Sequence, residues 1–237
     1  MKKLILVTGG NGRFAKILKQ KNKLLNLKFL SKNDLDILNS KSIEKCISKY
    51  KPKIIFHCAG LSRPMNIHNN DISKSINLNI IGTANMVKAC NKFNVKIIYF
   101  STGYVYEGIK GNYSEQDPTK PFNNYALSKL GGEASVLMYK NSLVLRLTMM
   151  EKPFPYKKAY TNLISNFMYH EDLVKILPKI INKFGVINVG GKKQSIYDFV
   201  KKTNKSIKKD KLSKSTNFPL NQTMSLKLLN KIMKNKI

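Results

Sequence analysis

The chain has 237 residues and a net charge of +30, and 42% of its residues are hydrophobic. This length and composition suit one sizeable folded domain, or one domain with a small lobe. Its apolar runs are too short for a membrane span, and the first, at residues 4–7, is too short for a signal peptide. Three widely separated cysteines, Cys46, Cys58 and Cys90, indicate reduced thiols in a cytoplasmic setting and not a disulfide framework or a zinc site.

The positive charge raises the question of nucleic-acid binding. Only Arg13, Arg63 and Arg146 are arginines, and the other basic residues are lysines spread along the whole chain. Recognition of bases and phosphates usually makes use of the bidentate guanidinium group of arginine. We therefore expect no specific nucleic-acid site, only weak binding to polyanions at low salt. An anionic small substrate would benefit from the same field.

Hydrophobic runs and helical patterns alternate along the first 148 residues. Strands are predicted at residues 2–8, 27–31, 53–60, 95–102 and 142–148, and helices at residues 13–21, 42–50, 72–93 and 123–140. Such alternation is typical of βαβ units. It predicts an α/β fold, with a Rossmann-like, doubly wound parallel sheet formed by residues 1–148.

Beyond residue 148 the pattern is looser. Residues 151–160 hold two prolines and three aromatics and are predicted to be a loop. Helices are predicted at residues 170–184, 195–205 and 224–233, a short strand at 185–191, and a mobile, lysine-rich connection at 205–216. We expect residues 149–237 to form a small lobe packed on the core.

A glycine turn joins the first strand to the first helix in the sequence VTGGNGRFA, residues 7–15. After Gly9, the spacing of Gly10, Gly12 and Ala15 fits the dinucleotide-binding fingerprint, with alanine at its permitted last place. Glycines let the backbone approach a pyrophosphate, and the helix that opens at Arg13 and Phe14 offers its amide donors. An ordinary strand-to-helix turn is the alternative interpretation.

The residues after the second strand bear on the choice of cofactor. An acidic residue here would read the ribose 2′-hydroxyl of NAD, but the sequence has Ser31 and Lys32, with Arg13 in the glycine turn. A hydroxyl and cations suit a 2′-phosphate, so NADP is the first choice and NAD the alternative. Asp36 is expected near the adenine.

A tyrosine and a lysine four residues apart, Tyr125 and Lys129, lie on one face of a predicted helix. They are either a solvated surface stripe or a proton donor and the cation that activates it. A free phenol titrates near pH ~10, and a nearby ammonium lowers that value. Thr102, at the end of a strand, would add a donor where negative charge develops on a carbonyl oxygen.

Together these motifs resemble a known family. TGGNGRFA, LDIL, KPKIIFHCAG, NLNIIGTANM, IIYFSTGYVYEG, YALSKLGGE and LVLRLT are similar, in this order, to the extended short-chain dehydrogenase/reductases. The NAD-dependent epimerase/dehydratase type, and within it the dTDP-4-dehydrorhamnose reductase-like branch, gives the best match. The resemblance implies an NAD(P)-dependent reductase of a nucleotide-linked 4-keto-6-deoxy sugar, and a second half that binds this substrate.

The resemblance also implies roles for residues at matching positions. Tyr125 would donate the proton to the substrate carbonyl, Lys129 would bind the nicotinamide ribose and lower the pKa of the tyrosine, and Thr102 would hold the carbonyl oxygen. Asn79 would lie in the helix beneath the active site. The nicotinamide side of the cofactor would be lined by Cys58, Ala59 and Gly60.

The sequence departs from the family at Gly103. Dehydratases carry an Asp-Glu pair after the threonine and reductases commonly an aspartate, so glycine argues against dehydration and leaves the substrate open. Residues 151–158 either contact the nucleotide or pack the lobe. His170, Glu171 and Asp172 are expected to be N-terminal helix residues, and His57 a hydrogen-bonded core histidine.

Two other functions remain open. One is a nucleotide-sugar 4-epimerase that retains NAD. The other is a non-catalytic NADP-binding protein, since a family member serves as the regulatory subunit of methionine adenosyltransferase. No metal-ligand spacing is recognised, no membrane association is expected, and a homodimer is compatible with the family.

Overall fold

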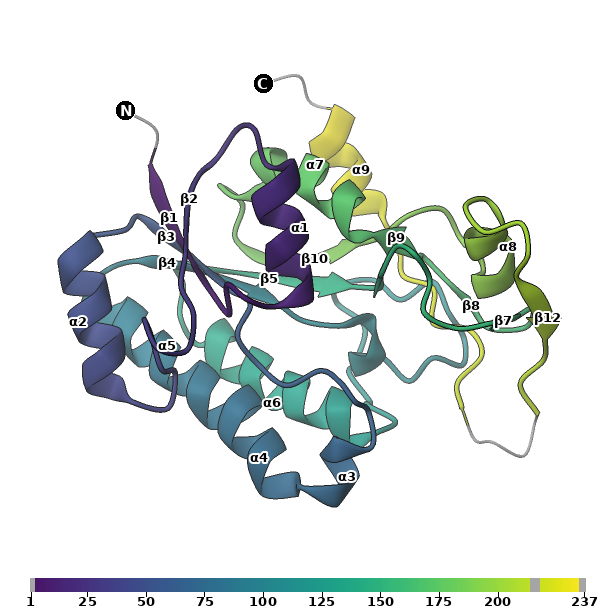
Figure 1. Ribbon diagram of the computed structural model, residues 1–237, viewed down its shortest axis with the longest axis horizontal. Helices are drawn as coiled ribbons and strands as arrows, with labels where there is room; N and C mark the ends of the chain where they lie inside the picture. The colour runs from purple at the N-terminus through teal and green to yellow at the C-terminus, as the bar shows by residue number, and fades with distance from the viewer. Residues whose placement is uncertain (1–2, 214–217, 235–237) are drawn as a thin grey trace.

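The computed structural model describes residues 3–213 and 218–234 (Figure 1). Its centre is a parallel six-stranded sheet with the order β10-β5-β4-β3-β1-β2. The chain winds outward from β1 in both directions, which confirms the predicted Rossmann-like, doubly wound topology. The strands of this sheet are β1 (Leu4–Thr8), β2 (Asn26–Phe29), β3 (Ile54–His57), β4 (Lys96–Phe100), β5 (Ser142–Leu147) and β10 (Gly185–Val189).

Helices cover both faces of the sheet (Figure 1). One face carries α1 (Arg13–Lys21), α7 (His170–Ile180) and α9 (Lys227–Lys234). The other carries α2 (Ser40–Tyr50), α5 (Gly82–Lys92) and α6 (Asn124–Leu137). Two helical layers around a sheet explain why its strands are apolar without interruption.

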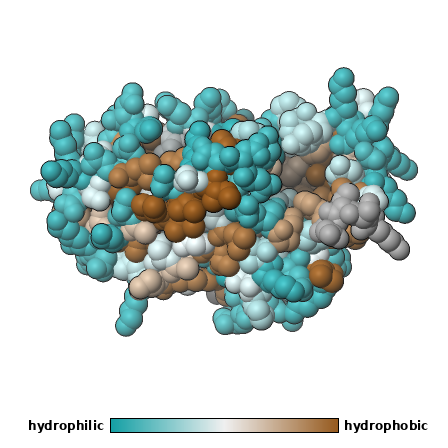
Figure 2. Space-filling view, turned by 90° about the horizontal axis from the view of Figure 1, so that it is seen from below, coloured by the Kyte–Doolittle hydropathy of each residue, from teal (hydrophilic) through white to brown (hydrophobic). Residues whose placement is uncertain are grey.

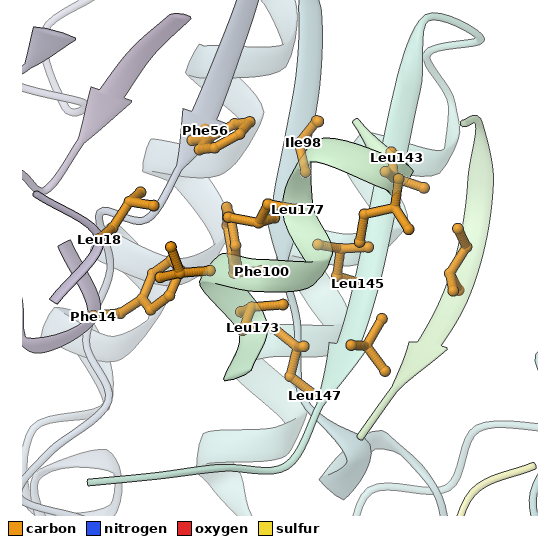
Figure 3. Packing of buried hydrophobic residues seen from close by; sticks show 14 of the residues in the cluster. Phe14, Leu18, Phe56, Ile98, Phe100, Leu143, Leu145, Leu147, Leu173 and Leu177 are labelled. Carbon is orange, nitrogen blue, oxygen red and sulfur yellow. The ribbon is translucent and has the colours of Figure 1, made fainter. Parts of the chain in front are cut away.

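Alternate residues of each strand enter two different cores. Ile5 and Val7 of β1 pack toward α1 and α7, whereas Leu6 packs toward α2 and α5. Figure 3 shows the first core, where Phe14 and Leu18 of α1 meet residues of β3, β4, β5 and α7. Side chains that alternate in this way fix the register of each strand, because a shift of one residue would exchange the two faces.

The predicted helix at residues 72–93 is continuous but not uniform. It consists of α4 (Ile72–Ile76), the π-helical segment η1 (Asn77–Ile81) and α5. A π-helical turn widens the helix locally and is often found at functional sites. A short helix, α3 (Ile67–Asn70), precedes it, and a 3₁₀ turn, η2 (Gly103–Val105), follows β4.

The small lobe has a core of its own, formed by residues such as Phe167, Tyr169, Phe199 and Val200. Its elements are β6 (Met149–Met150), β7 (Lys158–Tyr160), β8 (Ile164–Ser165), β9 (Met168–Tyr169), β11 (Gln194–Ser195), α8 (Ile196–Lys201) and β12 (Lys208–Asp210). Ser195, the first residue of the predicted helix 195–205, caps α8 by accepting a hydrogen bond from the amide of Asp198.

Three expectations need correction. The boundary at residue 148 does not separate two compact units, since β10, α7 and α9 complete the core sheet and its covering layer. The predicted helix 170–184 ends at Ile180. The lysine-rich connection 205–216 contains β12, which pairs with β7; residues 214–216 of it lie outside the described residues.

In the part of the chain that the structure describes, no helix combines the length and apolarity that crossing a membrane would require.

Candidate functional site

Thr102, Tyr125 and Lys129 meet beyond the carboxyl end of β4. Thr102 follows β4 and caps η2, since its Oγ1 accepts a hydrogen bond of 3.2 Å from the amide of Tyr104. Tyr125 and Lys129 lie in the first two turns of α6, whose N-terminus is capped by the side chain of Asn123. These caps fix the start of each element and so fix the direction of the side chains it carries.

The phenol of Tyr125 is held in its protonated form. Burial is the largest cause, and together with nearby Tyr104 it raises the pKa of Tyr125 to about 12. A hydrogen bond with the side chain of Thr102 and the charges of Arg13 and Arg63 act in the opposite direction. A phenol protonated at neutral pH can donate a proton but is a poor base.

Lys129 is buried above the ring of Tyr99, with its Nζ 3.9 Å from the ring centroid. Burial lowers the pKa of Lys129 to about 7, and the charge of Glu133 raises it in part. The expected lowering of the pKa of Tyr125 by Lys129 is not found, because burial of the phenol dominates and arginines supply the opposing charge.

Asn79 connects α6, which carries Tyr125 and Lys129, to the loop after β3. From the π-helical segment η1, its Oδ1 accepts a 2.7 Å hydrogen bond from the Leu61 amide. Its Nδ2 donates to the Leu61 carbonyl and to Ser128 Oγ, both at 2.8 Å. Ser128 in turn donates to the carbonyl of Tyr125. Asn79 therefore lies beneath the site, as the resemblance implied, and holds together the segments that form it.

The glycine turn is shaped by close backbone contacts. Gly9 has φ +65°, and a Cβ there would lie 2.8 Å from the backbone of Ala59. The amide of Gly10 donates to the carbonyl of Leu30, and that of Gly12 to the carbonyl of Gly9. Gly12 is the N-cap of α1 and offers no side-chain cap, and the first turn holds no acidic residue. The turn therefore leads into a helix N-terminus whose first amides have no side-chain cap, an arrangement that suits the predicted binding of a pyrophosphate.

Two residues of the turn have side chains in unexpected places. Phe14 is buried in the core, with its ring 5.2 Å from that of Phe100 and 5.7 Å from that of His170, so only its backbone can face a cofactor. The guanidinium of Arg13 binds Ser62 and Glu151, and is not directed to Ser31 and Lys32.

The segment after β2 holds a carboxylate that the sequence interpretation did not use. Asp34 Oδ2 accepts hydrogen bonds from the amide and the hydroxyl of Ser31, at 2.8 and 2.7 Å. These bonds lower the pKa of Asp34. Lys32 is exposed, and Asp36 accepts a hydrogen bond from the amide of Leu38. The segment predicted to bind the ribose 2′-group thus carries an acidic side chain bonded to Ser31 as well as the exposed Lys32.

The residues after β3 pack against the glycine turn. The amide of Ala59 donates to Thr8 Oγ1, and Gly60 lies against Asn79. Burial raises the pKa of the Cys58 thiol, although the charge of Lys129 opposes this. Cys58, Ala59 and Gly60 thus lie close to the glycine turn and to Lys129, and their place beside a nicotinamide stays a prediction.

His57 is a core histidine, as expected. Its Nδ1 and Nε2 hydrogen-bond the hydroxyls of Thr8 and Thr83, and burial lowers its pKa to about 3. His170, Glu171 and Asp172 begin α7, with Asp172 accepting from the amide of Tyr169, in line with the predicted helix start. Among the described residues no group of potential ligands is arranged for a metal ion.

Sequence reasoning missed several neighbours of Tyr125. His68, which we assigned no role, is 1% exposed, and its ring lies 5.1 Å from that of Tyr125. Its Nδ1 is 2.7 Å from Ser75 Oγ. Aromatic rings of Tyr104, Phe122 and Phe218 pack against one another on another side of the phenol. These three residues, at positions 68, 104 and 218, come together only in the tertiary structure, so no local sequence pattern could have found them.

A buried ion pair joins α6, the helix of Tyr125 and Lys129, to β5. Glu133 of α6 is fully buried and accepts two hydrogen bonds from Arg146 of β5, at 2.6 and 3.0 Å, and one from Ser101. Arg146 also donates to Tyr106, which donates to Asn188 of β10. With its donors and acceptors satisfied, such a network fixes one arrangement of its elements.

Gly103 lies in close contact with two residues of the second half of the chain. A Cβ at this position would lie 3.1 Å from Thr148 Oγ1 and 3.2 Å from Met224 Sδ. Met224 is buried and belongs to the returning C-terminal segment. A larger side chain at position 103, such as the aspartate that the resemblance leads us to expect, would therefore require Met224 to move.

With this geometry, comparison with known proteins identifies the family. The model of the family described as "RmlD substrate binding domain" matches residues 1–176. The chain belongs to this family. Among curated proteins of similar sequence, methionine adenosyltransferase 2 subunit beta of Bos taurus is 33% identical over 119 residues. The matched region is 49% of this chain and 35% of that protein. The dTDP-4-dehydrorhamnose reductase of Aggregatibacter actinomycetemcomitans is 29% identical over 147 residues, 60% of this chain and 50% of the reductase.

Solved structures share the RmlD-type fold over nearly the whole chain. A dTDP-4-dehydrorhamnose reductase from Bacillus anthracis, in complex with NADP, has a TM-score of 0.85 at 22% identity and covers 98% of this chain and 93% of that chain. A UDP-glucose 4-epimerase from Thermus thermophilus, in complex with NAD, has a TM-score of 0.77 at 17% identity and covers 97% and 92%. At these identities the likeness establishes the fold. The chain spans about a third of the curated subunit and half of the curated reductase.

Proposed function

We propose that this protein is an NAD(P)-dependent reductase of a nucleotide-linked 4-keto-6-deoxy sugar, with NADP as its first cofactor and NAD as the alternative. The observation that carries the proposal is the convergence of Thr102, Tyr125 and Lys129 beside the glycine turn. Membership of the RmlD family and the resemblance to dTDP-4-dehydrorhamnose reductases support it.

The residues of the chain divide the work of such a reaction. Tyr125, protonated at neutral pH, donates its proton to the carbonyl oxygen of the sugar. The hydroxyl of Thr102 donates to the same oxygen as negative charge develops there. Lys129 would bind the ribose hydroxyls next to the nicotinamide, and the glycine turn with the start of α1 would hold the pyrophosphate. The cofactor held by these residues would supply the hydride.

A panel of 4-keto sugar nucleotides, supplied with NADPH or NADH, tests the proposal through the loss of the absorbance of the reduced cofactor. We expect oxidation of NADPH only when a 4-keto sugar nucleotide is present. Tyr125→Phe should reduce kcat by about 10²–10⁴-fold, because general acid catalysis contributes about this much. Tyr139→Phe is the matched control, since Tyr139 donates to the Cys90 carbonyl away from the site. Unchanged turnover in Tyr125→Phe would refute the mechanism.

Two other functions stay open to test. A 4-epimerase would be purified with tightly held NAD and would interconvert sugars with no net oxidation of added cofactor. The curated relatives named as a methionine adenosyltransferase subunit raise the case of a non-catalytic binding protein. Dinucleotide binding without turnover on any sugar of the panel would favour that function over the reductase.

We further propose that the protein forms a homodimer through α4 and α6. Ile72, Ile76 and Leu127 on these helices are 54%, 40% and 51% exposed. Figure 2 shows a hydrophobic area on the face seen from below, the side on which α4 and α6 lie in Figure 1. Large exposed apolar areas are typical of interaction sites. Analytical ultracentrifugation should show a dimer that Ile76→Glu converts to a monomer, and a monomeric wild type would contradict this.

A further inference from the structure

Three charged side chains meet at the mouth of the proposed cofactor site. Glu151 Oε1 accepts hydrogen bonds from Arg13 Nη1 at 2.6 Å and from Arg63 Nη1 at 2.9 Å. The second amino group of Arg13 donates to Ser62 Oγ at 2.9 Å. The start of α1, the loop after β3 and the segment after β6 are thus bridged by one carboxylate oxygen.

The use of arginine here stands out against the composition of the chain. Three of its 43 basic residues are arginines, and Arg146 is buried in the pair with Glu133. The two others, Arg13 and Arg63, share the same oxygen of Glu151. Guanidinium groups bind carboxylates and phosphates with similar geometry. Two arginines that hold a carboxylate oxygen between them are therefore also suited to hold a phosphate oxygen.

The place of this bridge connects it to the cofactor and to the phenol. Arg13 is the first residue of α1, directly after Gly12 in the turn whose first helical amides have no side-chain cap. The charges of Arg13 and Arg63 both act on the phenol of Tyr125. Glu151 is therefore bonded to the two arginines whose charges reach the phenol, one of which begins α1. Its side chain is 28% exposed, so the carboxylate can leave the bridge without opening a core.

We propose that Glu151 is an internal competitor for the dinucleotide, its carboxylate holding Arg13 and Arg63 in the place that a phosphate of the cofactor takes when it binds. This inference rests on the proposed function. Binding exchanges one oxyanion for another between the same two guanidinium groups, and no covalent bond changes. Glu151 thereby weakens cofactor affinity and keeps the two arginines ordered in the free protein.

The affinity of NADPH for the full-length protein, measured by isothermal titration calorimetry, tests the exchange. We expect Glu151→Gln to lower the Kd about threefold to tenfold, since the amide is a weaker acceptor for arginine than the carboxylate it replaces. Glu44→Gln is the matched control, because Glu44 pairs with Lys92 on the surface of α2 at 2.8 Å. The control removes the same charge and should leave the Kd within about twofold.

A second ligand and a second variant separate the exchange from a general change of charge. Adenosine 2′-monophosphate lacks the pyrophosphate and should bind wild type and Glu151→Gln equally. Arg63→Gln should weaken NADPH binding about fivefold or more, because it removes a partner of the incoming phosphate. If Glu151→Gln binds NADPH no more tightly than wild type, or if both ligands gain equally, the exchange is wrong while the proposed function stands. If neither wild type nor Glu44→Gln binds NADPH or NADH, the proposed function fails, and the inference with it.

Discussion

At the scale of single residues, Lys129 carries a clear electrostatic cost. Its ammonium is buried beneath the site, and its pKa falls from 10.5 to about 7. Ionisable groups whose pKa is strongly shifted by burial are found mainly at functional sites. The cost should therefore be visible as a dependence of stability on pH that one substitution removes.

The sign of this dependence follows from the direction of the shift. Between about pH 7 and 10.5 the unfolded chain keeps the proton of Lys129 and the folded protein has released it, so the free energy of unfolding rises with pH across this window. We expect Lys129→Met to be more stable than wild type at pH 6, by on the order of 3 kcal/mol, with the gap closing toward pH 10.

Urea unfolding at several pH values measures this gap. Lys88→Met, at an exposed position of α5, is the control and should show no such gap. A Lys129→Met variant that is less stable than wild type at pH 6 would show that the contact with the ring of Tyr99 outweighs the burial of the charge.

At the scale of elements, the segment η1 explains how a single asparagine can reach two partners. Its wider turn carries Asn79, which bonds the backbone of Leu61 on one side and Ser128 on the other. The pattern of residues 72–93 predicted a helix and could not predict the π-helical turn, because a local repeat contains no information on what a buried amide must contact. The resemblance placed Asn79 beneath the site, but its partners depend on the tertiary structure.

We predict that Asn79→Leu lowers the free energy of unfolding by about 3 kcal/mol, since it removes three hydrogen bonds and leaves buried partners unpaired. Asn85→Leu is the matched control on the same helical stretch, because Asn85 makes one bond, to the carbonyl of Ile37. Hydrogen exchange at the amide of Leu61 should accelerate in Asn79→Leu alone. Equal losses of stability in the two variants would contradict a special role for Asn79.

Sequence reasoning succeeded where the determinants are local. The strands β1 to β5, the glycine turn at Gly9 and Gly10, and the helix starts near Ser195 and His170 were all predicted from spacing and residue type. It failed where two distant segments decide the outcome. The carboxylate of Glu151 between two arginines and the filling of space at Gly103 by Met224 join residues about a hundred positions apart.

At the scale of the whole molecule, the charge of +30 predicts behaviour that is independent of the site. We expect binding to duplex DNA at low salt that weakens at least tenfold between about 50 and 200 mM salt, because the bound lysines release counterions. Fluorescence anisotropy with two unrelated sequences measures this, and both should bind alike. A tenfold preference for one sequence at the higher salt would contradict the expectation that no specific nucleic-acid site exists.

The position of β10 in the sheet has a consequence for how the protein is made. Residues 185–189 form the strand that pairs with β5, so an emerging chain that has completed residues 1–148 still exposes the open edge of β5. Unpaired edges of this kind attract other chains. This edge can close only after residues 185–189 have left the ribosome, and α9 can dock on β10 only after that. The interval between the synthesis of β5 and that of β10 is therefore the time in which the emerging chain is open to aggregation.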